Sequence, residues 1–219
     1  MGTLGIMTRT ALALFVVMAL TSCGEPSQTS STALGGDSSG KTISIAGSSA
    51  LRWGEGDYGV VLAHGAAFDA ASWEKQAVAI TDQGATVIAV ENIDQDAIRD
   101  AVELLQGEGI ADVALVGASA GADAILDLAS QEPRLADQLI LLSPNATVDG
   151  LGDEPKLFVA SKDEPVAHVS AELAESSPGN ENAVKILPGS AHAQNILATD
   201  LAGPVLGAML ERLKRFAPR

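Results

Sequence analysis

The sequence is poor in cysteine, in aromatic residues and in basic residues, and each shortage excludes a class of protein. Among 219 residues there is one cysteine, Cys23, so neither an intramolecular disulfide nor a thiolate metal cluster can form. Aromatic residues make up 3% of the chain, too few for the stacking platforms that hold sugars or bases. Lysine and arginine number 13 against 28 acidic residues, which gives a formal net charge of −15. This balance argues against a nucleic-acid binder and against docking on anionic lipid through a basic patch.

The composition that remains is typical of a folded domain. Hydrophobic residues make up 47% of the chain and charged residues 19%, which excludes a disordered polyelectrolyte. A chain of 219 residues can bury a core without disulfides or metal sites to stabilise it, and one domain is the default at this length. We therefore expect one acidic globular domain rich in alanine and glycine.

The N-terminus carries an apolar segment, residues 10–20, behind a single arginine. It is shorter than the roughly 20 apolar residues that a membrane-spanning helix needs, and it is typical of a signal peptide. The residues Leu20-Thr21-Ser22, an apolar residue and two small ones, come directly before Cys23. This arrangement resembles the lipobox of bacterial lipoproteins, in which the cysteine is lipidated.

The lipobox resemblance implies a signal peptide over residues 1–22 and a lipid on Cys23, which would become the mature N-terminus. It also implies export and anchoring to the outer face of a bacterial membrane through that lipid. Residues 23–41, rich in serine, threonine and glycine, are expected to form a flexible tether ahead of a folded domain over residues 42–219. An ordinary signal peptide with a chance cysteine is the alternative interpretation.

Strand and helix patterns alternate through the rest of the chain. Short alternating stretches at 42–45 and around 51–53 predict a leading hairpin. Continuous apolar runs at 59–63, 85–90 and 113–116 are typical of strands buried on both faces of a parallel sheet, and further strands are expected at 139–142, 157–160 and 183–187. Helices are predicted at 72–82, 94–106, 120–130, 167–175 and 194–216, the last broken or kinked near Pro204. This order predicts an α/β fold, a mainly parallel sheet with helices on both faces and right-handed crossovers.

The sharpest chemical signal is the pentapeptide from Gly117 to Gly121, which follows a predicted buried strand and opens a predicted helix. A Gly-x-Ser-x-Gly match in this context indicates a catalytic serine on a tight turn, where the two glycines remove Cβ atoms that would collide. Ser119 at the apex is the candidate nucleophile. The backbone N–H of Ala120, at the positive end of the helix, is a candidate oxyanion donor. The alternative is a serine that only caps the helix.

A serine hydroxyl needs a base, and the sequence contains three histidines. His192 follows the last predicted strand, at the edge of a parallel sheet where ligands bind, and is the predicted base. His168 is expected to be a solvated helix residue.

The base in turn needs an acceptor that fixes its tautomer and stabilises its imidazolium form. Asp163 is the first acidic residue past the predicted strand 157–160 and is the predicted acid. Its neighbour Glu164 remains an alternative. Asp163 could otherwise be a helix N-cap or a turn residue.

The chain order Ser119, Asp163, His192, with each residue at a strand end, resembles that of the α/β-hydrolase superfamily. The resemblance covers residues 42–217. A serine nucleophile separates the chain from dienelactone hydrolases, which use cysteine, and from epoxide hydrolases and haloalkane dehalogenases, which use aspartate.

The segment His64-Gly65-Ala66 is similar to the oxyanion loop of that superfamily. The resemblance implies that the Ala66 N–H is the second oxyanion donor beside that of Ala120. It also implies a structural role for His64, through bonds to the loop backbone.

The resemblance implies a serine hydrolase, carboxylesterase-like, that cleaves small-molecule esters through an acyl-enzyme intermediate. The 13 residues from 143 to 155 are too few for the helical lid that is common in lipases, which implies an open site. The sequence contains no metal-ligand cluster, phosphate loop or dinucleotide fingerprint, so no cofactor and no metal is implied. The alternatives are a non-catalytic ligand-binding lipoprotein on the same fold, or an acyltransferase, thioesterase or peptidase with the same triad. No protein partner is indicated.

Overall fold

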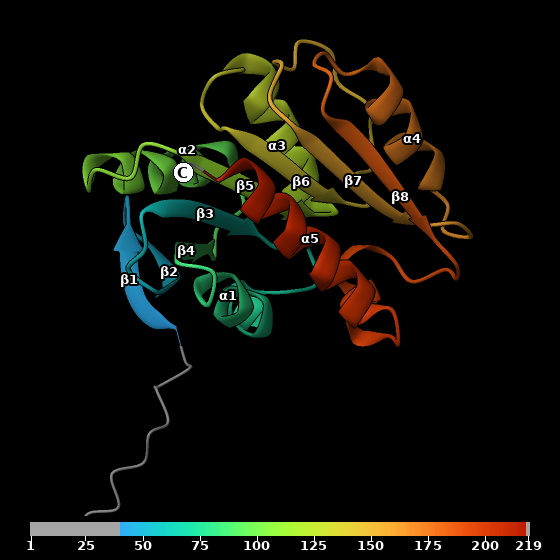
Figure 1. Ribbon diagram of the computed structural model, residues 1–219. Helices are drawn as coiled ribbons and strands as arrows, with labels where there is room; N and C mark the ends of the chain where they lie inside the picture. Colours follow the sequence, from blue (N-terminus) through green and yellow to red (C-terminus); the bar gives the residue numbers. More distant parts are fainter. Residues whose placement is uncertain (1–39, 218–219) are drawn as a thin grey trace, which may run out of the picture. The chain divides into compact units, whose positions relative to one another are not determined.

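The computed structural model of the protein describes residues 40–217 (Figure 1). At its centre is one eight-stranded sheet in the order β1-β2-β4-β3-β5-β6-β7-β8. The strands are β1 (Lys41–Ile45), β2 (Ser48–Trp53), β3 (Tyr58–Ala63), β4 (Ala85–Val90), β5 (Val113–Ala118), β6 (Gln138–Leu142), β7 (Lys156–Ser161) and β8 (Asn182–Leu187). The β1-β2 and β2-β4 pairs are antiparallel and the other pairs are parallel, so the predicted leading hairpin and mainly parallel sheet are confirmed.

Helices cover both faces of this sheet, as predicted (Figure 1). The helical elements are η1 (Ala70–Trp73), α1 (Glu74–Thr81), α2 (Gln95–Gly107), α3 (Ala120–Gln131), α4 (Ala167–Ser176), η2 (Ala193–Ala198) and α5 (Ala202–Phe216), where η denotes a 3-10 helix. One apolar core joins the sheet to α2, α3 and α4, and a second joins it to α1 and α5. Val61 belongs to the first core and its neighbour Val60 to the second, and both side chains are fully buried. This two-sided burial is the reason that the central strands are continuous apolar runs.

Two predicted helices have different boundaries in the structure. The helix predicted at 72–82 is the 3-10 helix η1 leading into α1, and η1 begins where Asp69 Oδ1 accepts from the Ser72 N–H at 2.9 Å. The single kinked helix predicted at 194–216 is two elements, η2 and α5, with the break at residues 199–201. Pro204 does not cause this break, because it lies in the first turn of α5, where a missing N–H removes no helical hydrogen bond.

The predicted signal peptide 1–22 and the predicted lipidation site Cys23 lie outside the described residues. The predicted tether 23–41 also lies outside them except for its last two residues, and Lys41 already belongs to β1. Within residues 40–217 no helix has the length and apolar character needed to cross a membrane. The described connection between β6 and β7 contains no helix, and no lid is evident over the carboxyl edge of the sheet.

Candidate active site

Ser119 lies at the apex of a sharp turn between β5 and α3, as the pentapeptide predicts. Its backbone has φ 49° and ψ −116°, a conformation that costs a non-glycine residue about 1–3 kcal/mol. The turn is tight enough to require both flanking glycines. A Cβ on Gly121 would lie 2.4 Å from the carbonyl oxygen of Ala63 in β3, and one on Gly117 would lie 2.7 Å from the carbonyl oxygen of Gly121. Close backbone packing at this turn therefore places Ser119 at the carboxyl edge of the sheet.

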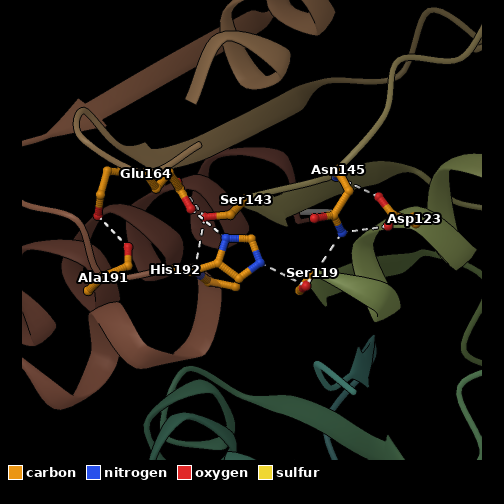
Figure 2. A network of polar contacts seen from close by, with 9 residues as sticks. Ser119, Asp123, Ser143, Asn145, Glu164, Ala191 and His192 are labelled. Atoms are coloured by element: carbon orange, nitrogen blue, oxygen red, sulfur yellow. Dashed lines mark hydrogen bonds and ion pairs between the residues drawn. The ribbon is translucent and has the colours of Figure 1, made fainter. Parts of the chain in front are cut away.

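A chain of two hydrogen bonds connects Ser119 to a buried carboxylate through His192 (Figure 2). Ser119 Oγ lies 2.8 Å from His192 Nε2, and His192 Nδ1 lies 2.5 Å from Glu164 Oε2. An ionised carboxylate can only accept, so Nδ1 carries the proton and Nε2 presents its lone pair to the serine hydroxyl. The Glu164 side chain is fully buried, whereas the His192 side chain is 34% exposed. This arrangement suits the transfer of the serine proton to His192.

The acid at His192 is Glu164, so the prediction of Asp163 is wrong and the alternative takes its place. In the turn after β7, the Asp163 N–H donates to Gly189 O at 2.9 Å and the Asp163 side chain points to solvent. The Glu164 side chain instead folds back over the strand end, where the Ser161 N–H donates to Oε1 at 2.8 Å. This backbone geometry therefore directs Glu164, and not Asp163, toward His192.

Ser143, which was not predicted from the sequence, holds the carboxylate and the histidine loop together (Figure 2). Its hydroxyl donates to Glu164 Oε1 at 2.8 Å and accepts from the Ala193 N–H at 2.9 Å. Ser143 is fully buried at the carboxyl end of β6 and has φ 47°. The available signal was its place as the first polar residue after a buried parallel strand.

Asn145 and Asp123 form a second polar pair beside the nucleophile (Figure 2). The Asn145 N–H and the side-chain Nδ2 each donate to the Asp123 carboxylate at 2.7 Å. The same Nδ2 lies 3.4 Å from Ser119 Oγ. Asp123 is one helical turn after Ser119, so this pair borders the nucleophile on the side of α3.

The loop after β3 lies against Ser119. A Cβ on Gly65 would lie 3.6 Å from Ser119 Cβ. His64 is buried, with Nδ1 2.8 Å from Gly65 O and Nε2 3.1 Å from Glu91 O. A neutral imidazole has one N–H, so it donates to one of these two backbone carbonyls. Ala66 is exposed in this loop.

The other oxyanion donor predicted from the sequence, Ala120, is the first residue of α3. The first N–H groups of a helix have no acceptor within the helix, so the Ala120 N–H stays a candidate oxyanion donor. His168 is exposed on α4, as predicted. Among the described residues no group of three or more His, Cys, Asp or Glu side chains could hold a metal ion.

The sheet order, the two helical layers and the serine turn together define the α/β-hydrolase fold. Among solved structures, the chain resembles a monoacylglycerol lipase from Paleococcus ferrophilus, with a TM-score of 0.66 and 12% identity over 80% of this chain and 100% of that one. A soluble variant of monoglyceride lipase from Saccharomyces cerevisiae gives a TM-score of 0.66 and 12% identity over 82% of this chain and 96% of that one. Epoxide hydrolase A from Mycobacterium thermoresistibile gives a TM-score of 0.65 and 16% identity over 83% of this chain and 99% of that one. No protein-family model and no curated protein sequence matches the chain.

Proposed function

We propose that the protein is a serine hydrolase that cleaves carboxylic esters, with Ser119 as nucleophile, His192 as general base and Glu164 as the acid that orients His192. The observation that carries this proposal is the pair of hydrogen bonds from Ser119 through His192 to the buried Glu164. Neighbours with the same fold include both lipases and an epoxide hydrolase, so the fold alone does not select the chemistry. The choice of ester hydrolysis rests on the serine and its bonded base.

In the proposed first half-reaction, Ser119 Oγ attacks the ester carbonyl carbon while its proton passes to His192 Nε2. The buried Glu164 carboxylate, already bonded to Nδ1, stabilises the imidazolium that forms. The carbonyl oxygen gains negative charge, which the N–H groups of Ala66 and Ala120 would accept as hydrogen-bond donors. One such donor contributes about 3–4 kcal/mol to the rate.

The tetrahedral intermediate then expels the alcohol, which takes its proton from His192, and Ser119 remains acylated. In the second half-reaction His192 takes a proton from water, the hydroxide attacks the acyl carbon, and the carboxylic acid leaves as Ser119 regains its proton. General base assistance of this kind contributes about 10²–10⁴-fold to each step. An ester is favoured over an amide because an alcohol leaves more readily than an amine. These steps use only groups of this chain and water.

We also propose the cellular setting that the N-terminal sequence indicates, namely export and attachment to the outer face of a bacterial membrane through a lipid on Cys23. A lidless site facing solvent would accept small or extended esters without interfacial activation. Mass spectrometry of the mature N-terminus would test the lipid, and a Cys23→Ser variant that stays in the membrane fraction would refute it.

The enzymatic proposal is tested with a p-nitrophenyl ester series from C2 to C12, using the purified full chain and Ser119→Ala. We expect turnover by the wild type, a fall of at least about 10³-fold in kcat for the variant, and fluorophosphonate labelling of the wild type only. A folded wild-type protein with neither turnover nor labelling would refute the serine-hydrolase proposal. A non-catalytic binding role would then be the better interpretation.

A further inference from the structure

The side chain of Gln194 joins two parts of the site that lie far apart in the sequence. Gln194 is in η2, two residues after His192, and it is 5% exposed. Its Oε1 accepts from the Gly65 N–H at 2.7 Å, and its Nε2 donates to Ser72 Oγ at 2.9 Å. Ser72 Oγ in turn donates to the backbone carbonyl of Asp69. The direction of these three hydrogen bonds is fixed, because the Gly65 N–H can only donate and the Asp69 carbonyl can only accept.

The bond to Gly65 matters because Gly65 sits between the two peptide units that shape the oxyanion loop. Gln194 holds the unit on its N-terminal side through the Gly65 N–H. The Gly65 carbonyl, on the C-terminal side, accepts from the Phe68 N–H at 2.9 Å and also lies 2.8 Å from His64 Nδ1. A peptide unit is planar and trans, so fixing the Gly65 carbonyl also fixes the opposite direction of the Ala66 N–H. With both units held, the φ and ψ angles of Gly65 are determined, although a glycine would otherwise rotate freely.

We propose that Gln194 is a positioning residue for the oxyanion hole: it aims the Ala66 N–H by locking Gly65, and it ties that donor to the loop that carries the base. This inference rests on the proposed function, because the Ala66 N–H has a catalytic task only in acyl transfer. Among the described residues, the hydrogen bonds of the Gln194 side chain go to Gly65 and Ser72 and not to Ser119 or His192. We therefore expect the loss of this side chain to act mainly on the charge that develops on the substrate oxygen in the transition state.

This role predicts a kinetic signature that differs from that of a general packing residue. Loss of one oxyanion donor lowers kcat by roughly 10²–10³-fold, and a donor that is only misaligned part of the time lowers it less. For Gln194→Met, which keeps the side-chain length and removes both hydrogen bonds, we expect kcat to fall about 10- to 100-fold. KM should stay within about threefold, because the oxyanion contact forms in the transition state. The pH profile of kcat/KM should be unchanged, because the His192–Glu164 bond is untouched.

The experiment compares wild-type protein, Gln194→Met and the control Gln106→Met, which makes the same chemical change at an exposed glutamine at the end of α2. For each protein we would measure kcat, KM, the pH profile and the affinity for a trifluoromethyl ketone, which forms a tetrahedral adduct with a catalytic serine. The affinity for the ketone should fall in parallel with kcat in Gln194→Met, and the control should match the wild type. Unchanged kcat in Gln194→Met, or a loss accompanied by a shifted pH profile, would overturn the positioning role.

Ser72→Ala gives a second and milder test, which also applies if Gln194→Met does not fold. It removes the acceptor of Gln194 Nε2 at an exposed position and leaves the bond to Gly65 in place. We expect a fall of several-fold in kcat with unchanged KM, and no further loss when Ser72→Ala is added to Gln194→Met. Independent, multiplying effects of the two substitutions would overturn the inference. Failure of the proposed function is recognised separately, because the wild-type protein itself would then show neither ester turnover nor a fluorophosphonate adduct.

Discussion

The sharpest prediction concerns Glu164→Gln, a change of one carboxylate oxygen into an amino group. Glu164 Oε1 accepts from the backbone N–H of Ser161 and from the hydroxyl of Ser143. A backbone N–H can only donate, so the glutamine must place its carbonyl oxygen at the Oε1 position. Its amino group then faces His192 Nδ1, which has to accept instead of donate.

That reversal has a calculable consequence for catalysis. With Nδ1 accepting, the proton of neutral His192 moves to Nε2, which lies 2.8 Å from Ser119 Oγ. The base then points an N–H at the serine and cannot take its proton. The corresponding acid-to-amide change in serine proteases lowers kcat about 10⁴-fold, so we expect a loss of about 10³–10⁴-fold here, or roughly 4–5 kcal/mol of transition-state stabilisation.

The assay is ester turnover at saturating substrate, with Asp163→Asn as the matched control. Asp163 is exposed and its backbone N–H, not its side chain, contacts the neighbouring loop, so the control should keep kcat within about threefold. Thermal unfolding of both variants would show whether either change disturbs the fold. The reasoning is refuted if Asp163→Asn loses activity and Glu164→Gln keeps it.

Two further predictions concern stability. Gly121→Ala would place a Cβ 2.4 Å from the Ala63 carbonyl oxygen and should lower the free energy of unfolding by roughly 1–3 kcal/mol in urea melts. Gly207→Ala in α5 should raise the free energy of unfolding slightly, because a Cβ there meets no atom within 4 Å beyond its chain neighbours and the backbone of its own helix. Equal effects of the two glycine substitutions would contradict the steric argument. Burial raises the pKa of the Glu154 carboxyl above its ordinary value, although Lys156 Nζ lies 3.3 Å away. The folded state therefore binds this proton more tightly than the unfolded chain, so the ionised form costs stability above the raised pKa and the cost fades as the pH falls toward the ordinary value. The free energy of unfolding of Glu154→Gln, measured relative to that of the wild type, should therefore be higher at pH 7 than at pH 4. A difference between the two proteins that is the same at both pH values would contradict this.

The strand pattern and the serine turn could be predicted because both depend on neighbours in the sequence. Runs such as 59–63 are apolar throughout because each strand is buried on both faces, so that every position in it favours an apolar residue. Gly117 and Gly121 mark the serine turn because a Cβ at either position would meet backbone atoms. The break at residues 199–201 was not predicted at its true place, because proline marks where a helix cannot continue and not where packing ends it.

The fold class could be predicted from the sequence alone, as could the proposed nucleophile and the proposed base, since each depends on local sterics or on a strand end that the apolar pattern locates. The carboxylate that bonds His192 could be identified only from the folded structure, because Asp163 and Glu164 are adjacent and chemically equivalent. The choice between them is made by donors from elsewhere, with Ser143 bonding Glu164 and Gly189 holding the backbone of Asp163. The same holds for Gln194, whose partner Gly65 is 129 residues away. Contacts of this kind form between loops that are distant in the sequence and lie at one edge of the sheet, so a local sequence pattern does not predict them.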